Sequence, residues 1–226
     1  MGASPKTLDQ LNAQIVACER CSRLREHCIQ IAAVRRRAYA DWEYWGRPVP
    51  SFGDPQARVL ILGLAPGAHG SNRTGRPFTG DFAGDLLYAT LLEYGFAKGV
   101  YQARPDDGLR LVDCRISNAV RCVPPQNKPL PAEIHTCRQF LTATITSMPK
   151  LRAIVALGRI AHESTLKALG LRGAAAPFTH GAVHTAGHLR LYDSYHCSRY
   201  NTNTRVLTPE MFRSVFAKVR SDLDKG

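Results

Sequence analysis

The sequence predicts an α/β protein, arranged as a three-layer α/β/α sandwich around a central four-stranded parallel sheet. Two observations carry this prediction. Four short segments are apolar enough to form strands, at residues 59–62, 111–120, 153–157 and 189–195. Between them lie stretches with helical spacing of apolar residues, and strands that alternate with helices in this way form parallel sheets covered on both faces.

The first of these strands leads into a loop that carries many side chains able to bind or react with a ligand. Val59 to Leu62 are four consecutive aliphatic residues, as in a strand buried on both faces. The loop that follows, residues 63–84, is rich in glycine but also carries polar and aromatic side chains, at His69, Asn72, Arg73, Arg76, Phe78, Thr79 and Asp81. Loops at the carboxyl ends of parallel strands are where α/β proteins bind ligands. We therefore expect a ligand-binding loop, followed by a helix from Gly84–Asp85 onward.

Several helices are expected around the sheet. The first spans residues 7–18 with Thr7 as a cap, and the second runs from about 23 to 44. The arginine run at 35–37 is interpreted as a solvated face, with phosphate contact as the alternative. Trp42, Tyr44 and Trp45 are interpreted as core or hinge packing. Later helices are expected at 131–147, at 160–169 and from Pro209, whereas 170–188 is interpreted as a loop.

Composition narrows the class of partner. The 226 residues are expected to form a single domain, 1–226, with an N-terminal helical extension over about 1–50. A formal net charge of +12 points to a polyanionic partner, nucleic acid first, although a basic surface can also serve solubility alone. No apolar run approaches the ~20 residues of a membrane span. We expect a cytoplasmic protein, without a membrane partner, that acts as a monomer.

The seven cysteines suggest metal ligation. Cys18 and Cys21 form a C-x-x-C pair, and Cys122 and Cys137 flank the proline-rich loop at 124–129. Two close and two distant thiolates can complete a tetrahedral site, for which spacing alone leaves zinc and an iron–sulfur cluster both open, as well as two unrelated buried pairs. The other three cysteines, Cys28, Cys114 and Cys197, are expected to be unligated.

At this point the motifs resemble one superfamily. The segments 63–70 (GLAPGAHG), 72–81 (NRTGRPFTGD) and 194–204 (SYHCSRYNTNT), together with the four cysteines, are similar to the iron–sulfur bacterial branch of the uracil-DNA glycosylases, in its family 5 or type B group. The resemblance runs from about residue 11 to 216. It implies a parallel sheet between helices, a structural [4Fe-4S] cluster on Cys18, Cys21, Cys122 and Cys137 rather than zinc, and hydrolysis of the bond between a damaged base and deoxyribose in DNA. It also implies a bacterial protein that associates with the nucleoid through DNA.

The resemblance assigns roles to side chains of the expected site. Phe78 would stack on a base flipped out of the helix, and the amide of Asn118 would pair with the edge of uracil. His196 would donate to O2 of the departing base. Asp81, helped by His69, would position water or offset the cationic sugar, with a helix-capping role for Asp81 as the alternative.

The remaining assignments concern the walls of the site and the DNA backbone. Gly63, Ala65 and Gly67 would line the substrate. Phosphate and minor-groove contacts are expected from six residues: Arg73, Arg76, Ser198, Arg199, Tyr200 and Arg205. The chain departs from its relatives at Leu64 and Ala65, where other branches have an acid, and at Cys197, where proline is usual and whose replacement should loosen the loop.

The expected activity is therefore a monofunctional DNA glycosylase that removes uracil, and other deaminated or damaged bases, and leaves an abasic site. No lysine stands in the matched motifs to form a Schiff base, so lyase activity is not expected. The alternative is a DNA-binding relative that holds uracil or abasic DNA without turnover, which Leu64, Ala65 and Cys197 keep open. A labelled uracil duplex separates the two.

Overall fold

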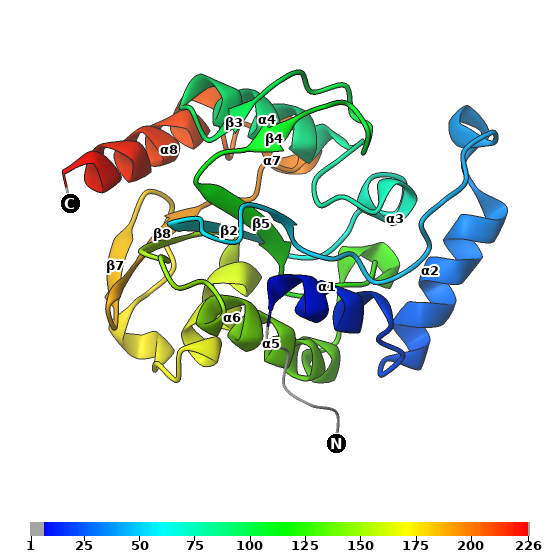
Figure 1. The fold of residues 1–226 in the computed structure, drawn as a ribbon, viewed down its shortest axis with the longest axis horizontal. Coiled ribbons are helices and arrows are strands. Elements are labelled where there is room, and N and C mark those ends of the chain that lie inside the picture. Colours follow the sequence, from blue (N-terminus) through cyan, green and yellow to red (C-terminus); the bar gives the residue numbers. More distant parts are fainter. Residues whose placement is uncertain (1–6, 226) are drawn as a thin grey trace.

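The computed structural model describes residues 7–225 and has a mixed sheet at its centre (Figure 1). The strand order is β1-β5-β2-β6-β8-β7. The four middle strands are parallel, β5 (Cys114–Asn118), β2 (Val59–Gly63), β6 (Ala153–Leu157) and β8 (Leu189–Ser194). They are the four strands that the sequence predicts, so the predicted fold class is confirmed.

Two short antiparallel strands extend this sheet at its edges. β1 (Phe52–Gly53) pairs with β5, and β7 (Val183–Ala186) pairs with β8. The interpretation of 170–188 as loop is therefore wrong for β7, because its alternation of exposed and partly buried residues is too short to separate from a turn. A separate two-stranded sheet joins β3 (Ala97–Lys98) to β4 (Arg110–Leu111).

Helices cover both faces of the sheet (Figure 1). On one face α4 (Phe82–Glu93) and α8 (Pro209–Asp224) share a core with alternate residues of β2, β5 and β6. On the other face α1 (Leu8–Val16), α5 (Pro131–Thr146) and α6 (Arg159–Ala168) form a second core with the remaining apolar residues of β2 and β6 and with Leu189 and Leu191 of β8. All residues of β2, β5 and β6 are buried, which explains their lack of a polar face in the sequence.

The helices start where the sequence places capping residues. Thr7 caps α1 by accepting from the backbone N–H of Gln10, and Thr208 caps α8 in the same way through Met211, with Pro209 at the first helical position. Asp81 caps α4, so that helix begins at Phe82, two residues before the predicted start. None of the described helices is long and apolar enough to cross a membrane.

The N-terminal region differs most from expectation. The second helix, α2 (Ser22–Val34), ends about ten residues early, because Arg35 turns the chain with φ of 56°. A single 3-10 turn, η1 (Arg37–Tyr39), follows. Short helical turns also occur at α3 (Ser71–Thr74), η2 (Pro125–Asn127), η3 (Gly173–Ala175) and α7 (Arg199–Asn203). Of these, α3 and α7 lie inside the two motifs that were expected to carry function.

Candidate active site

A cavity of about 1020 Å³ lies at the carboxyl ends of β2 and β8. Its walls come from the loop after β2, from the turn before α7, from the η1 segment and from the loop at 102–104. This is the end of a parallel sheet at which α/β proteins bind ligands. The two sequence motifs therefore meet in one hollow, as predicted from their positions after strands.

Phe78 is fixed by an unusual backbone conformation at the base of this cavity. The residue is 5% exposed and has φ of 53°, a left-handed value that costs energy in a residue with a side chain. Its neighbours hold it in place: the Tyr88 hydroxyl donates to the carbonyl of Pro77 at 2.7 Å, and the Tyr101 hydroxyl donates to that of Phe78 at 3.4 Å. Gly84 gives further room, since a Cβ there would lie 1.7 Å from the Phe78 carbonyl oxygen. The fold therefore holds this ring in one orientation.

Asn118 lies beside the Phe78 ring at the end of β5. It is directly opposite Gly63 in the parallel pairing of β2 and β5. A Cβ on Gly63 would lie 2.5 Å from Asn118 Oδ1 and 2.5 Å from Phe78 Cζ, so glycine lets the amide and the ring approach the strand together. Asn118 is 2% exposed, and its Oδ1 has no hydrogen-bond partner among the described residues. A buried acceptor without a donor is costly, so this oxygen is a candidate ligand contact directly behind the Phe78 wall, although Asn118 itself is not among the described lining residues of the cavity.

His196 faces the same ring from the loop after β8. The Phe78 and His196 rings stack with centroids 5.9 Å apart and an interplanar angle of 24°. Burial lowers the pKa of His196 to about 4. The imidazole is therefore neutral at physiological pH, and it can donate one N–H hydrogen bond into the cavity without carrying a charge.

Asp81 has two roles in the structure, one for each oxygen. Its Oδ1 accepts from the backbone N–H of Gly84 at 3.0 Å and so caps α4. Its Oδ2 lies against Gly67 and Gly70, where a Cβ would come within 2.8 and 2.4 Å of that oxygen. Burial raises the pKa of Asp81. The capping alternative is thus confirmed, and it leaves the carboxylate in the cavity wall.

Three more predicted residues, Ala65, Gly67 and His69, line the cavity from the loop after β2. Ala65 lies in the wall next to Leu64, and both are apolar. His69 Nδ1 is 3.0 Å from the Tyr44 hydroxyl, and its pKa is lowered by burial and by the nearby charges of Arg36 and Arg73. Asp81 and Asp85 are the two acidic residues among the described lining residues. The departure noted at Leu64 and Ala65 therefore leaves Asp81 as the predicted catalytic carboxylate in the cavity wall.

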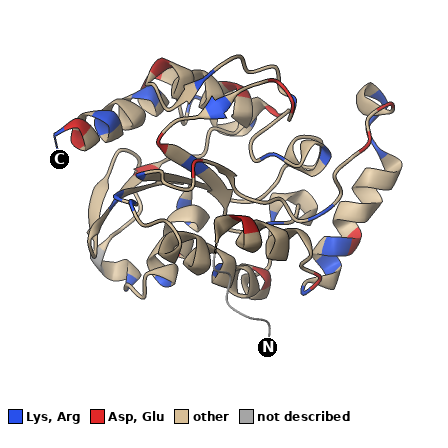
Figure 2. Cartoon of the chain, viewed as in Figure 1, with Lys and Arg blue, Asp and Glu red and all other residues tan. Residues whose placement is uncertain are grey.

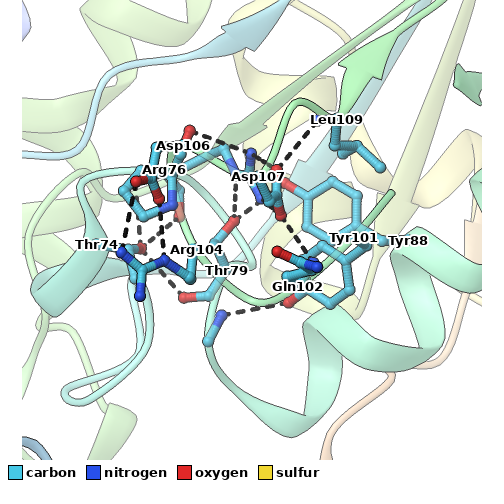
Figure 3. A network of polar contacts seen from close by, with 12 residues as sticks. Thr74, Arg76, Thr79, Tyr88, Tyr101, Gln102, Arg104, Asp106, Asp107 and Leu109 are labelled. Carbon is cyan, nitrogen blue, oxygen red and sulfur yellow. Dashed lines mark hydrogen bonds and ion pairs between the residues drawn. The ribbon is translucent and has the colours of Figure 1, made fainter. Parts of the chain in front are cut away.

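Arg76 is a correction to the predicted phosphate contacts. Its guanidinium is 5% exposed and forms two short bonds with Asp107, Nη1 to Oδ1 at 2.8 Å and Nη2 to Oδ2 at 2.7 Å (Figure 3). Burial would raise the pKa of Asp107, but the bonds from Arg76 and from the amides of Gln102 and Leu109 lower it to about 2. Arg76 therefore ties the 102–109 loop to the motif and is not available to DNA.

The C-terminal motif lies at the rim of the cavity. Ser198 caps α7 by accepting from the backbone N–H of Asn201, and Arg199 stacks over the Phe82 ring at 5.3 Å. Tyr200 is 74% exposed, as a residue that enters a groove of DNA has to be. Arg205 is exposed but lies past α7, outside the described lining of the cavity.

Cys197 does not loosen the motif as predicted. Its side chain is buried in the core beside α4, and the thiol donates to the carbonyl of Ala83 at 3.5 Å. At this position the packing of the Cys197 side chain against α4 holds the loop, where a proline ring would do so through its fixed backbone angle. The sequence could not show this, because burial of Cys197 depends on where α4 lies.

The four predicted ligand cysteines line one small cavity between α2 and α5. Cys18, Cys21, Cys122 and Cys137 all contribute to it, and the amide of Arg121 donates to Cys137 Sγ at 3.3 Å. The interpretation as two unrelated pairs is therefore wrong. Across the described residues, no three of these sulfurs come within 4.8 Å of one another. Cys28 is buried against Cys122 at the edge of this cavity.

Several residues of the main cavity were missed by sequence reasoning. Tyr39 and Trp42 line it, and each ring stacks on the Arg73 guanidinium with Cζ 4.0 Å from its centroid. Trp42 is thus not core packing, whereas Tyr44 is 7% exposed and the Trp45 indole donates to Pro48, as predicted for packing residues. The end of α2 could not be predicted, so these rings could not be placed. Lys and Arg are spread over helices and loops of both layers (Figure 2), so overall charge does not point to this face.

The fold and the cavity define a class of protein: an α/β protein with an aromatic slot, a buried amide and a neutral histidine at the carboxyl end of its parallel sheet. Comparison with known proteins gives the family. A model of the uracil DNA glycosylase superfamily matches residues 50–220, and the chain belongs to this superfamily. The resemblance seen in the motifs is confirmed.

Individual relatives agree with this assignment. The chain is 48% identical to the type-5 uracil-DNA glycosylase of Thermus thermophilus over 207 residues, which cover 91% of this chain and 94% of that protein. It is 46% identical to the type-5 uracil-DNA glycosylase of Mycobacterium tuberculosis over 93% of this chain and 80% of the relative. Similarity to a type-4 uracil-DNA glycosylase of Sulfurisphaera tokodaii is lower, at 26% identity over 92% of this chain and 83% of the relative.

Proposed function

We propose that this protein is a DNA repair glycosylase that hydrolyses the N-glycosidic bond of uracil in DNA and leaves an abasic site. The observation that carries the proposal is the buried, unpartnered Oδ1 of Asn118 beside the Phe78 ring. Uracil offers an N–H at N3, which is the donor that this oxygen lacks. Two relatives that are 48% and 46% identical to this chain are uracil-DNA glycosylases.

The cavity suits a nucleotide that has left the stack. A base inside duplex DNA is not accessible to chemistry at its glycosidic bond, so the enzyme has to extrude it. The volume of about 1020 Å³ is at the upper end of the ~300–1,000 Å³ typical of ligand pockets, and it leaves room for the base and its sugar–phosphate. Phe78 supplies the stacking surface, and Asn118 reads the base edge.

Bond cleavage puts negative charge on the base and positive charge on the sugar. His196, neutral because burial lowers its pKa to about 4, donates an N–H toward the departing base. Asp81 supplies a carboxylate in the wall, where it offsets the cationic sugar or orients the attacking water. No lysine is among the described residues of the cavity, which supports a monofunctional enzyme.

We extend the proposal to a structural [4Fe-4S] cluster on Cys18, Cys21, Cys122 and Cys137. When bound, the cluster would tie the N-terminal helices to α5 and supply no reacting group. Two observations favour it over a zinc ion. Sulfurs around one zinc lie about 3.8 Å apart, since each Zn–S bond is ~2.3 Å, whereas among the described residues no three of these sulfurs lie within 4.8 Å of one another.

The second observation is a buried positive charge next to the thiols. Arg121 is 2% exposed and lines the same small cavity, and within residues 7–225 its side chain bonds to the hydroxyls of Ser51 and Thr144 alone. No carboxylate of the described residues pairs with it, and its Nε has no partner. A buried cation needs a counter-charge, which a cluster with four thiolates provides.

One experiment tests the proposed function. A duplex with a single labelled uracil is incubated with excess protein and then treated with alkali, which cleaves at abasic sites. Strand cleavage that depends on alkali is expected, and its loss in His196→Ala and in Asp81→Ala would assign both residues to the chemistry. DNA that is bound but never cleaved would contradict the proposal and support the alternative of a binding protein without turnover.

The finer features of the proposal have their own tests. A brown protein that absorbs in the visible blue would identify the cluster, and metal analysis would separate it from zinc. Removal of other deaminated bases is tested with the same duplex carrying hypoxanthine or xanthine. Seven free cysteines support a reducing, cytoplasmic setting, and gel filtration tests the expected monomer.

A further inference from the structure

Arg73 is a buried cation in the cavity wall that the chemistry proposed above does not use. It is 4% exposed, and the carboxylate that acts on it electrostatically, Asp81, forms no hydrogen bond or ion pair with it among the described residues. Its Nε donates to the carbonyl of His69 at 2.7 Å, and its Nη2 makes one long contact with the Gly80 carbonyl, at 3.5 Å. Nη1 has no partner. Burial lowers the pKa of Arg73, and the nearby Asp81 carboxylate offsets only part of this effect.

The surroundings of Arg73 hold the guanidinium plane in one place. Tyr39 and Trp42 each stack on it with a centroid distance of 4.0 Å, which compensates part of the cost of burying the charge. Gly80 leaves the space that Nη2 fills, since a Cβ there would lie 2.3 Å from this nitrogen. A guanidinium fixed in this way presents its free N–H edge without further loss of side-chain entropy.

The same part of the cavity holds two further arginines. Arg36 and Arg104 line it together with Tyr39 and Trp42; Arg104 stacks over the Trp42 ring at 5.3 Å and pairs with the exposed Asp106 at 3.1 Å. Both the aromatic slot of Phe78 and this arginine lobe open into one cavity, so a nucleotide in the slot carries its own phosphates toward the lobe.

We propose that Arg73, clamped by Tyr39 and Trp42, is the binding site for one backbone phosphate of the strand that carries the target base. The missing partner of Nη1 would be a phosphate oxygen, held by a charge-assisted hydrogen bond. This inference rests on the proposed function for its substrate. It adds that one phosphate contributes far more than its neighbours, in contrast to the diffuse attraction of surface arginines.

The test pairs a protein variant with a DNA variant. Each phosphate near the uracil is replaced in turn by an uncharged methylphosphonate, and both affinity and single-turnover excision are measured for the wild type and for Arg73→Met, which keeps the side-chain length but removes the charge. In the wild type one position should lose about 10- to 100-fold, as for a hydrogen bond to a charged group, and Arg73→Met should show the same loss on unmodified DNA. On DNA that carries the methylphosphonate at that position, Arg73→Met should bind and excise no more weakly than it does on unmodified DNA.

Matched variants separate this role from charge and from folding. Arg152→Met removes the same charge from an exposed residue at the amino end of β6 and should leave the methylphosphonate profile unchanged. Tyr39→Leu and Trp42→Leu keep the charge but loosen the clamp, so they should weaken the effect of the same phosphate. Arg73→Met should also reduce the slope of log affinity against log salt by about 1.

Three outcomes would overturn the inference: a wild type in which no single phosphate matters, losses that add in Arg73→Met at every position, or unchanged binding by that variant. The wild-type scan keeps its meaning if Arg73→Met fails to fold. The affinity readout does not require turnover. A protein that binds with this profile but releases no uracil would therefore contradict the proposed function alone.

Discussion

Gly63→Ala tests whether the end of β2 shapes the base slot. The new Cβ would lie 2.5 Å from Asn118 Oδ1 and 2.5 Å from Phe78 Cζ, against the 3.4 Å at which ordinary contact begins. Each group has to move by about 0.9 Å, the difference between these distances. A misplacement of about 1 Å in an active site costs on the order of 100-fold in rate, whereas overpacking costs about 1–3 kcal/mol of stability. We therefore expect a folded protein with single-turnover uracil excision reduced about 100-fold.

The matched control is Gly173→Ala. A Cβ on Gly173 would meet nothing within 4 Å, and neither glycine has a positive φ, so the two substitutions differ in steric contact and not in backbone strain. Urea unfolding gives the stability of both variants, and rapid-quench assays give their rates. Excision by Gly63→Ala at the wild-type rate, or a loss equal to that of Gly173→Ala, would refute the steric account of this slot.

Three further predictions address charge and stability. Arg76→Met leaves Asp107 buried without its partner and should lower the free energy of unfolding by about 3–5 kcal/mol in urea titrations; a loss below 1 kcal/mol would contradict the buried pair. Burial raises the pKa of Asp81, so a required carboxylate becomes protonated at a pH above the usual carboxyl range. The excision rate of the wild type should fall as the pH drops through this range. The pH profile of Asp81→Asn should lack this acidic decline. His162 contacts buried Asp193 at 2.7 Å and the Ala176 carbonyl at 2.9 Å, and His184 also lies 3.1 Å from Asp193, so His162→Leu should cost about 1–3 kcal/mol, and an unchanged melting temperature would contradict it.

The parallel core could be predicted because its signal is local. Val59 to Leu62, Ala153 to Leu157 and their counterparts are apolar without interruption, which in a chain of this length indicates strands buried on both faces. The edge strands β1 and β7 could not be predicted, because two to four half-exposed residues carry no distinctive period. Arg35 ends α2 through a left-handed turn that no glycine or proline announces.

Prediction of the site succeeded where motif position alone decides. Phe78 and His196 line one cavity, and Asn118, the last residue of β5, lies next to the Phe78 ring. Prediction of the site failed for long side chains, which can point either into the cavity or toward another part of the protein. Arg76 and Arg73 are three residues apart in one loop, yet one is paired with Asp107 and the other has no carboxylate partner among the described residues. That difference depends on a loop about thirty residues further along the chain and on the two rings of the η1 segment.

The claim that Asn118 Oδ1 receives the N3–H of uracil is tested most directly by comparing excision of uracil and of 3-methyluracil from the same duplex. The methyl group removes the one donor that the buried oxygen lacks. The wild type should excise 3-methyluracil about 100-fold or more slowly than uracil, since an unpaired buried acceptor costs ~1–3 kcal/mol and the methyl group adds a clash. In Asn118→Ala, which removes both the acceptor and the clash, the two rates should converge. Equal rates in the wild type, or an unchanged ratio in Asn118→Ala, would contradict the account.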